Sequence, residues 1–514
     1  MRYYGATLEH PRDVARILQK PLALFPDRSA LVTFDGTWSY RELEAMADCY
    51  ARNLMDLGVK PGDRVASLLP NCGKLFVHYL GCLKLGAVLV PLNYRYTSRE
   101  IAHAIGVSEA RAIVYDAERT ADIDAAEGID TVSLRLAADT HAMDGDDDVT
   151  PLLTRPSGNV LLPVAPDAPA VIYFTSGSTG PAKGVTHTHR TFGWIIASSI
   201  QTYQLAPDDR VLAALSCSHV GGSMLTLSAF FEGAMVLAPR VGDPRRQLEM
   251  MRQHRATVAV LLPAALFDLE RSQYARTEDF ASLRVCISGG DKVPEQLEKE
   301  FSAKTGLPID ELYGMTEIGL SHINPSSGLV KFGSFGRVAP GYAAEIRDEA
   351  RQPVAAGEMG RLWVKFPGTL LAYWNRPEAT AEVHDDDGWF DTGDIVSVDT
   401  EGYFTFCGRK KQIIVHDGSN IFPQEVEDAV LEHPAVEKVG VVGVHDTVHG
   451  ENVRAYVAIK PGATAPDPVD LIAFAAERVG YKAPERIVFL DEIPVNPTGK
   501  VDRVTLKKLA TEDV

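Results

Sequence analysis

A segment that joins glycines, hydroxyl side chains and one lysine is the strongest chemical signal in this sequence. It covers Tyr173 to Gly184 and starts on an apolar run, Ala170 to Phe174, that predicts a buried strand. Glycines let backbone N–H groups converge on an anion, hydroxyls add donors, and Lys183 adds a positive charge. The segment therefore predicts a phosphate-binding loop rather than an ordinary linker. It is not a Walker loop, because Gly184 stands where a magnesium-binding Ser or Thr would follow the lysine.

Five further short motifs follow this loop in order. They are Ser288 to Asp291, Glu311 to Glu317, Asp391 to Asp394, Gly408-Arg409 and Asn496 to Lys500. Together with Thr175 to Gly184 they resemble the signature motifs of the adenylate-forming superfamily, which contains acyl-CoA synthetases, luciferases and peptide-synthetase adenylation domains. The resemblance extends over essentially the whole chain from Trp38 onward, and six ordered motifs rarely arise by chance. It implies an enzyme that uses ATP to convert a carboxylic acid into an acyl adenylate and then transfers the acyl group to a thiol.

The resemblance also implies a binding site for ATP and AMP, and the residue types suit that role. Tyr313 offers a flat face for stacking adenine, and Thr316 can donate a hydrogen bond to the α-phosphate. Asp394 resembles the family's acceptor for the ribose hydroxyls, with a plain turn aspartate as the alternative, and Arg409 resembles its partner near the ribose and phosphate. The expected ATP- and AMP-binding residues are Thr175, Ser176, Gly177, Ser178, Thr179, Gly180, Lys183, Gly289, Gly290, Asp291, Glu311, Leu312, Tyr313, Gly314, Met315, Thr316, Asp394, Phe406 and Arg409.

Catalysis is expected from Lys500, Thr316, Glu317 and His219. Attack of a carboxylate on the α-phosphate brings two anions together, so a mobile cation such as Lys500 would stabilise the transition state. A lysine near a C-terminus is usually solvated, and only the Pro-Thr-Gly-Lys context favours the catalytic role. Glu317 is a hard oxygen ligand that suits Mg²⁺, which keeps most of its waters and needs few protein carboxylates. The alternative for Glu317 is a surface glutamate at the start of a helix.

The acyl group is expected in a pocket next to His219. This histidine resembles the family's gate between the carboxylate and the thiol channel, and a core histidine is the alternative. Its segment, Ser218 to Gly222, has no acidic residue to pair with an α-ammonium group, which disfavours amino acids as substrates. The run Ser223 to Phe231 is small and apolar, so a fatty, aryl or bulky alicyclic or terpenoid acid is expected. The expected pocket residues are His219, Val220, Gly221, Gly222, Leu225, Gly289, Gly314, Met315, Gly319 and Leu320.

The resemblance implies a hinge two places after the Gly-Arg pair, at Lys411. About this hinge a C-terminal domain, residues 410–514, would move relative to an N-terminal adenylation domain, residues 1–409. The N-terminal domain would hold ATP and the acyl pocket, and the C-terminal domain would carry Lys500.

The acceptor thiol favoured by the resemblance is coenzyme A, with contacts from Gly418, Ser419 and Asn420. Gly418 keeps a position where a side chain would obstruct the pantetheine tunnel. The loop nevertheless departs from the family pattern, because His416-Asp417-Gly418 replaces a more common Ser-Gly-Gly and therefore loses one glycine.

The elements that must position these residues alternate between helix and strand. An amphipathic helix over Tyr40 to Leu57 precedes buried-strand runs at Ala66 to Leu69 and Ala87 to Val90. After an acidic, loop-like connector, His141 to Asn159, the alternation resumes; short strands dominate from about Gly357, and a compact α+β module closes the chain. The predicted fold class is α/β, with a large N-terminal domain of two βαβ-type subdomains plus a small β-barrel subdomain, followed by a mobile small α+β C-terminal domain.

Composition limits the classes of partner. The net charge is −18, from 51 Lys and Arg against 69 Asp and Glu, and such an acidic protein repels nucleic acid. The six cysteines are scattered, which indicates neither a disulfide framework nor a zinc site. No apolar run is long enough to span a bilayer and no export or peroxisomal signal is evident, so we expect a cytoplasmic enzyme. Its expected partners are a small carboxylic acid, ATP with Mg²⁺, and CoA, and a homodimer stays open.

Two other functions also stay open. An acyl-AMP ligase that loads a carrier protein would share the adenylation motifs, although neither a carrier domain nor a large N-terminal insertion is evident. A non-catalytic sensor of adenylates on the same fold is disfavoured by the presence of Lys183, Glu317 and Lys500.

Overall fold

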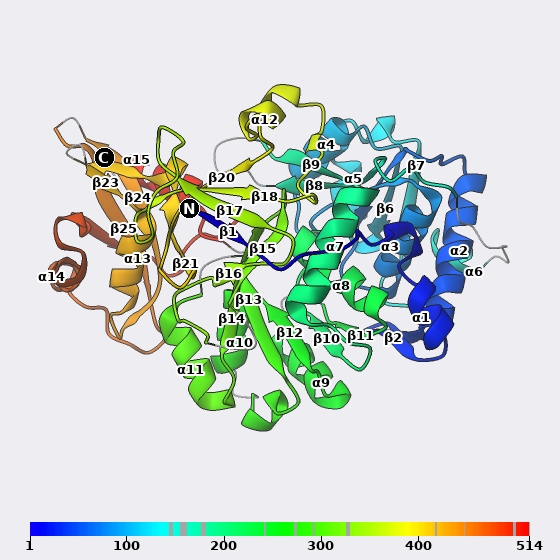
Figure 1. Cartoon of the computed structure of the whole chain (residues 1–514), viewed down its shortest axis with the longest axis horizontal. Helices are drawn as coiled ribbons and strands as arrows, with labels where there is room; N and C mark the ends of the chain where they lie inside the picture. Colours follow the sequence, from blue (N-terminus) through cyan, green and yellow to red (C-terminus); the bar gives the residue numbers. More distant parts are fainter. Residues whose placement is uncertain are drawn as a thin grey trace.

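The computed structural model contains four β-sheets within the part of the chain that it describes, with helices packed against them (Figure 1). The described residues are 1–142, 147–154, 162–175, 181–240, 243–271, 275–290, 293–324, 329–416, 419–446, 448–496 and 500–512. Three sheets are built from strands that precede Lys410, and the fourth is built from strands that follow it. This arrangement confirms the predicted α/β fold class with a smaller C-terminal unit.

The first sheet is mostly parallel in its centre, with strand order β19-β9-β8-β5-β4-β6-β7. Its strands are β19 (Ala372–Tyr373), β9 (Lys183–Thr188), β8 (Pro169–Thr175), β5 (Val88–Pro91), β4 (Arg64–Leu68), β6 (Ala112–Asp116) and β7 (Leu134–Ala138). The helices in this part of the chain are α2 (Tyr40–Asp56), α3 (Gly73–Leu85), α4 (Ser98–Ser108), α5 (Thr120–Asp124) and α6 (Thr150–Thr154). The predicted βαβ rhythm is therefore present here.

The second sheet combines strands from distant parts of the sequence, in the order β16-β15-β14-β13-β12-β10-β11-β2-β3. Its strands are β16 (Arg337–Val338), β15 (Gly319–Ile323), β14 (Ile309–Met315), β13 (Val285–Gly289), β12 (Val258–Leu261), β10 (Arg210–Ala213), β11 (Met235–Ala238), β2 (Ser29–Thr33) and β3 (Gly36–Ser39). Its helices are α1 (Gln19–Leu24), α7 (His189–Tyr203), α8 (Val220–Glu232), α9 (Pro244–His254), α10 (Pro263–Arg271) and α11 (Glu295–Thr305). Helix α7 contacts β8 and β9 of the first sheet and β15 of the second, so it lies between the two sheets.

The third sheet is antiparallel and is the small β subdomain that the sequence predicted. Its order is β1-β17-β18-β20-β21, formed by β1 (Arg2–Tyr4), β17 (Ala343–Arg347), β18 (Gly360–Lys365), β20 (Phe390–Val398) and β21 (Phe404–Arg409), and α12 (Pro377–Glu382) lies between β19 and β20 in the chain. In Figure 1 it lies between the C-terminal unit and the rest of the molecule. The N-terminal strand β1 was not predicted, because its pairing partner β17 lies more than three hundred residues away.

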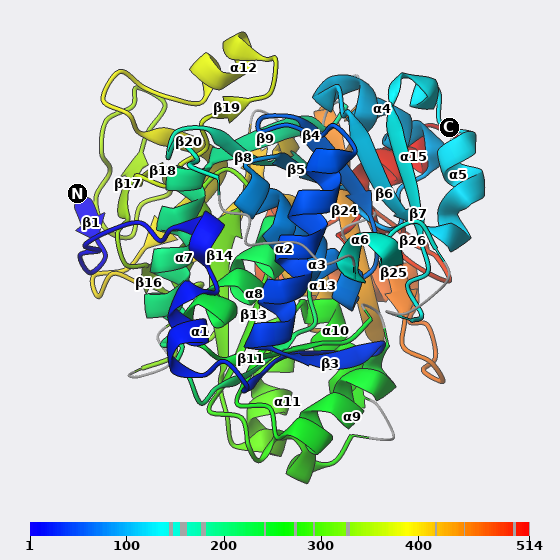
Figure 2. The ribbon, with the colours of Figure 1, turned by 90° about the vertical axis from the view of Figure 1, so that its right-hand side faces the viewer.

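The C-terminal unit is an α+β module around the fourth sheet. Its strands are β22 (Ile414–His416), β23 (Ser419–Ile421), β24 (Val436–Asp446), β25 (Gly450–Ile459) and β26 (Arg486–Phe489), and its helices are α13 (Pro423–Leu431), α14 (Pro468–Val479) and α15 (Arg503–Glu512). The view of Figure 2 shows its strands and helices behind the first sheet. No helix in the described parts of the chain has the length and apolar character needed to cross a membrane.

Local sequence accounts for the long helices. Ser39 and Glu42 form a capping box at the start of α2, in which each side chain accepts a hydrogen bond from the backbone N–H of the other residue. The apolar face predicted for this helix is buried, and Leu43, Tyr50 and Leu54 are all fully covered. The predicted helix therefore forms because its cap and its apolar stripe agree.

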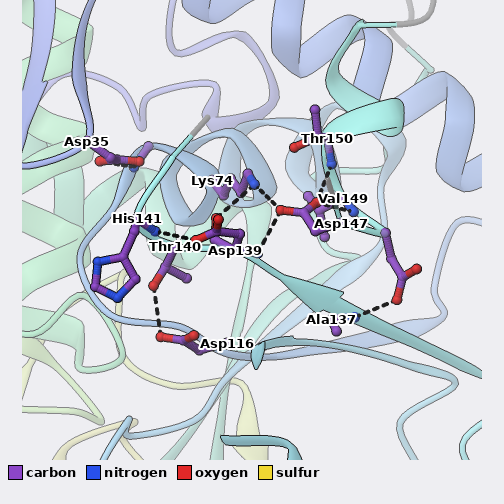
Figure 3. Close-up of polar contacts among 12 residues, drawn as sticks. Asp35, Lys74, Asp116, Ala137, Asp139, Thr140, His141, Asp147, Val149 and Thr150 are labelled. Atoms are coloured by element: carbon purple, nitrogen blue, oxygen red, sulfur yellow. Dashed lines mark hydrogen bonds and ion pairs between the residues drawn. The ribbon is translucent and has the colours of Figure 1, made fainter. Parts of the chain in front are cut away.

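The acidic connector contains a buried ion pair that the sequence did not indicate. The Nζ of Lys74, on α3, forms an ion pair with the Asp147 carboxylate and donates to the Asp139 carbonyl at 2.8 Å (Figure 3). The two side chains are 0% and 6% exposed. Asp147 also accepts from the backbone N–H groups of Val149 and Thr150, and through these bonds it caps α6. The described part of the connector is thus fixed to the first subdomain and is not a plain loop.

Replacing Lys74 by methionine is expected to lower the free energy of unfolding by about 3–5 kcal/mol, because the Asp147 carboxylate would stay buried without its cation. Denaturation followed by circular dichroism measures this. Arg190→Met is the matched control, since the pair of Arg190 with Asp167 is 46% and 73% exposed and its loss should change the stability little. Similar small losses in both variants would contradict the assignment of a buried ion pair.

Candidate active site

Most of the predicted site residues lie at the carboxyl ends of strands, where open α/β sheets bind ligands. Thr175 ends β8, and Lys183 pairs with it as the first residue of the antiparallel strand β9. Gly289 ends β13, and the segment Glu311 to Glu317 runs along β14 into the turn before β15. Of the predicted residues, Ser176, Gly177, Ser178, Thr179, Gly180, Asp291 and Gly418 lie outside the described residues.

A buried carboxylate, Glu317, is the centre of the charged cluster. It is only 6% exposed, and its Oε1 accepts a hydrogen bond of 2.9 Å from the Tyr373 hydroxyl. Burial raises the pKa of Glu317, and this rise is opposed by the Tyr373 hydroxyl and by the charges of Arg409 and Lys183. The Nζ of Lys183 lies over the Tyr373 ring, 4.6 Å from its centroid. Two cations therefore lie close to one buried anion: Lys183 is on β9, Arg409 is on β21, and Glu317 lies in the turn between β14 and β15.

A second chain of contacts orients the predicted adenine and ribose residues. The Tyr313 hydroxyl donates to Asp394 Oδ2 at 2.6 Å, and Asp394 Oδ1 lies 2.9 Å from Nε of Arg409. The ring of Phe335 packs near the Tyr313 ring, with centroids 4.8 Å apart and planes inclined by 31°. The hydrogen bond at the hydroxyl and the packing of the Phe335 ring together fix the orientation of the Tyr313 ring. Phe406, on β21, is partly exposed next to this group.

The Thr316 backbone is held by a histidine. Nε2 of His187 lies 2.8 Å from the Thr316 carbonyl, and burial lowers the pKa of His187 to about 4. The neutral ring must then donate from Nε2, since a carbonyl only accepts. His187 lies within β9 whereas His189 begins α7, so the two rings do not share one strand face, and no group of three metal-ligating side chains occurs among the described residues.

Two glycines among the predicted pocket residues lie where neighbouring strands pack too closely to admit any side chain. A Cβ on Gly314 would lie 2.3 Å from the Gly319 carbonyl oxygen, and a Cβ on Gly289 would lie 2.5 Å from the Leu312 side chain. Leu320 is buried on β15, and Val220, Gly221, Gly222 and Leu225 lie on the first turns of α8. The predicted pocket residues thus come from β13, β14, β15 and α8.

Glu311, one of the expected ATP- and AMP-binding residues, contacts the segment before α11. Its Oε1 accepts a hydrogen bond of 3.4 Å from the Val293 N–H.

His219 and Lys500 lie near each other, although His219 belongs to the N-terminal part of the chain and Lys500 to the C-terminal unit. His219 is the N-cap residue of α8. Burial, and then the charge of Lys500, lower the pKa of His219 to about 4. Lys500 itself is held in a turn, in which its N–H donates to Asn496 Oδ1 at 3.1 Å and its carbonyl accepts from the Asn496 N–H at 2.8 Å. The C-terminal unit therefore brings its lysine to the edge of the predicted acyl pocket.

The remaining predicted contacts belong to the C-terminal unit. Lys411 is exposed in a short 3-10 helix, Lys410–Gln412, between β21 and β22, and Ser419 and Asn420 begin β23. Gly408, just before this helix, has φ +148°, and a Cβ there would lie 2.8 Å from the Phe422 ring. A glycine is therefore needed where the chain passes from the third sheet to the fourth.

Two residues of this site, Tyr373 and His187, were not predicted as functional. Tyr373 lies 56 residues from Glu317 in the sequence, and His187 lies 129 residues from Thr316. The adjacent aromatic pair Tyr373-Trp374 after a short apolar run was the available signal for the first.

Comparison with known proteins agrees with this geometry. Residues 18–374 match the family described as AMP-binding enzyme, and residues 425–500 match the AMP-binding enzyme C-terminal domain. Feruloyl-CoA synthase of an Amycolatopsis species is 34% identical over 90% of this chain and 92% of its own length. Indoleacetate–CoA ligase of Aromatoleum aromaticum is 32% identical over 97% of this chain and 98% of its own length.

A solved structure shares the whole fold. ATP-bound MatB from Rhodopseudomonas palustris is 29% identical and superposes with a TM-score of 0.90 over 97% of this chain and 99% of that chain. The apo form of the same protein gives a TM-score of 0.80. The arrangement of this chain is therefore closer to the ATP-bound form, in keeping with the proximity of Lys500 to His219.

Proposed function

The chain belongs to the family of AMP-binding enzymes and is an acid–thiol ligase, and we propose that it joins a hydrophobic aryl acid to coenzyme A by way of an acyl adenylate. The observation that carries this proposal is the convergence of Lys183 and Arg409 near Glu317, together with the proximity of Lys500 to His219. Such a group of cations suits a reaction in which a carboxylate meets a triphosphate.

In the first half-reaction a carboxylate oxygen of the acid attacks the α-phosphorus, and pyrophosphate leaves with the electrons of the broken P–O bond. Lys500 carries the positive charge that offsets the two approaching anions, and Thr316 donates to the α-phosphate. Tyr313 and Asp394 hold the adenine and ribose. Lys183 and Arg409 position the phosphates, so most of the rate gain comes from orientation and charge.

In the second half-reaction a thiol attacks the acyl carbon, AMP leaves with its phosphate oxygen, and the thiol proton is released. His219 lies where the thiol channel would meet the acyl group. Lys411 is the proposed hinge of the C-terminal domain, residues 410–514. Gly418, Ser419 and Asn420 are the proposed contacts of coenzyme A.

Glu317 fits a role in holding Mg²⁺ with the nucleotide. It is a buried carboxylate whose Oε1 is occupied by Tyr373, and Mg²⁺ needs only one or two protein carboxylates beside substrate phosphates and water. The ion would supply charge neutralisation at the phosphates.

An aryl acid is favoured over the other hydrophobic acids by the named substrates of two relatives. The relatives named above act on feruloyl and indoleacetyl groups. Fatty and alicyclic acids are the alternatives within the same pocket.

The decisive experiment offers the purified enzyme a panel of cinnamic, benzoic, indoleacetic, fatty, alicyclic and amino acids with ATP, Mg²⁺ and CoA, and measures release of AMP and formation of thioester. We expect the best aryl acid to exceed the best fatty acid by at least about tenfold in kcat/KM, which corresponds to about 1.4 kcal/mol of transition-state binding. Amino acids as the preferred substrates would contradict the pocket assignment. Activity with holo-carrier protein but not with CoA would show a carrier-protein ligase, and no pyrophosphate release with any acid would indicate a sensor.

A further inference from the structure

Asn93 contacts His219 from the other subdomain. It lies two residues after β5 of the first sheet, whereas His219 follows β10 of the second, and the two are 126 residues apart in sequence. The Asn93 side chain is only 6% exposed. Its Nδ2 lies 3.1 Å from His219 Nε2.

The orientation of the Asn93 amide follows from its contact with the backbone of Arg95. The backbone N–H of Arg95 donates to the second atom of the amide at 2.9 Å, and that atom must be oxygen because a backbone N–H only donates. The atom that faces His219 is therefore the NH₂ group, which also only donates. Nε2 of His219 must accept, and the neutral ring consequently carries its proton on Nδ1.

The backbone around His219 is clamped independently. Asn71 donates to the Leu215 carbonyl at 2.8 Å and accepts from the Cys217 N–H at 3.0 Å, and the Tyr79 hydroxyl donates to the Cys217 carbonyl at 2.5 Å. A Cβ on Gly222 would lie 2.3 Å from the Ser216 carbonyl oxygen, so α8 packs directly on this loop. The loop cannot move as a body without breaking several buried bonds. Only the His219 side chain can turn at the cost of a single hydrogen bond.

The charge state of the ring agrees with this arrangement. Burial and the nearby Lys500 lower the pKa of His219 to about 4, so the ring is neutral at physiological pH. Lys500 disfavours a second positive charge, and the Asn93 NH₂ group offers no acceptor to an imidazolium. Lys500 therefore favours the neutral ring, and Asn93 selects its Nδ1–H tautomer.

We propose that Asn93 is the positioning residue that holds the His219 imidazole, as its Nδ1–H tautomer, in the orientation used for adenylate formation, and that the thiol reaches the adenylate only when this hydrogen bond breaks. The proposal rests on the proposed role of His219 as a gate. It adds that Asn93, a residue of the first subdomain, holds this gate in place through one hydrogen bond.

The tautomer can be measured without any turnover. Full-length protein labelled with ¹⁵N-histidine gives the state of each ring by NMR, and the His219→Gln spectrum assigns the signal. We expect the Nδ1–H tautomer in the unaltered protein and a mixture in Asn93→Ala. In Asn93→Asp the carboxylate should accept from Nε2–H, reverse the tautomer and raise the titration midpoint by about one unit or more. Asn53→Ala removes another buried asparagine, which donates to the Leu152 carbonyl, and as the matched control it should leave the tautomer unchanged. An Nε2–H ring in the unaltered protein would overturn the proposal, as would an unchanged ring in Asn93→Asp.

Kinetics of the two half-reactions then test the function of the contact. Asn93→Ala should slow acyl-AMP formation about tenfold, which is the loss expected for one hydrogen bond, while thioester formation from supplied acyl adenylate is not slowed. In a His219→Ala background the same substitution should have no further effect. An equal loss in that background would show a merely structural asparagine and overturn the proposal. If no acid is activated at all, the ligase assignment fails, whereas the NMR result still decides whether Asn93 fixes the ring.

Discussion

Lys500→Ala is expected to reduce acyl-AMP formation by about two to three orders of magnitude, the range found when a preorganised charge is removed from a transition state. The same variant should still convert a supplied acyl adenylate and CoA into thioester, because the second half-reaction involves no approach of two anions. Exchange of labelled pyrophosphate into ATP measures the first step, and thioester formation from synthetic adenylate measures the second.

The geometry explains why this lysine and not another should matter. Lys500 lies in a turn closed by its two bonds with Asn496, and its charge reaches His219 at the acyl pocket. Lys507 is the matched control, since it lies in the same unit on α15, its side chain is 57% exposed and its Nζ lies 4.0 Å from Glu451 Oε1. Lys507→Ala should change neither step. Equal losses of both steps in Lys500→Ala would show a general structural role and refute the assignment.

Glu317→Gln is expected to reduce acyl-AMP formation by about a hundredfold and to raise the Mg²⁺ concentration needed for half-maximal activity. Glutamine keeps an oxygen that can accept from Tyr373, so the substitution removes the charge with little change of shape. Initial rates measured over a series of Mg²⁺ concentrations test this. A rate and Mg²⁺ requirement equal to those of the unaltered enzyme would show that Glu317 is not a metal ligand.

The pH dependence provides a second test of Glu317. Because burial raises its pKa, protonation begins at a higher pH than for an ordinary glutamate, and activity should be lost as pH falls through that raised pKa. Tyr373→Phe removes a hydrogen bond that stabilises the charged form, so its acid limb should shift to higher pH. This variant keeps the ring beside Lys183 and should lose at most about tenfold in rate at neutral pH. A shift of the acid limb to lower pH would contradict the contact.

The fold class followed from patterns that are local in sequence. The helix over Tyr40 to Leu57 carries both its capping box and its apolar stripe within one segment, and it forms with an end shifted by one residue. The strand predicted over Ala170 to Phe174 forms as β8, with one more residue at each end. In contrast, the pairing of β1 with β17 and the addition of β2 and β3 to the second sheet depend on contacts between distant segments.

The features of the site divide in the same way, into motifs that are local in sequence and contacts that join distant residues. The order of motifs from Thr175 to Lys500 was sufficient to predict adenylate chemistry, because each motif needs particular residue types at fixed short spacing. The contact of Tyr373 with Glu317, of His187 with Thr316 and of Asn93 with His219 could not be predicted, since each joins residues 56 or more positions apart. The aspartates of the acidic connector predict an exposed loop. In the structure, however, Asp147 is buried because it forms an ion pair with Lys74.

The sequence by itself therefore determined the enzyme family and predicted its class of chemistry, because phosphate binding and acid activation depend on residue types and on their spacing within a motif. Only the tertiary structure decided how the groups are held: which face of Tyr313 is packed, how far Glu317 is buried, and in which tautomer His219 stands. These properties depend on desolvation and on hydrogen bonds between subdomains, and no pattern within a single segment contains them.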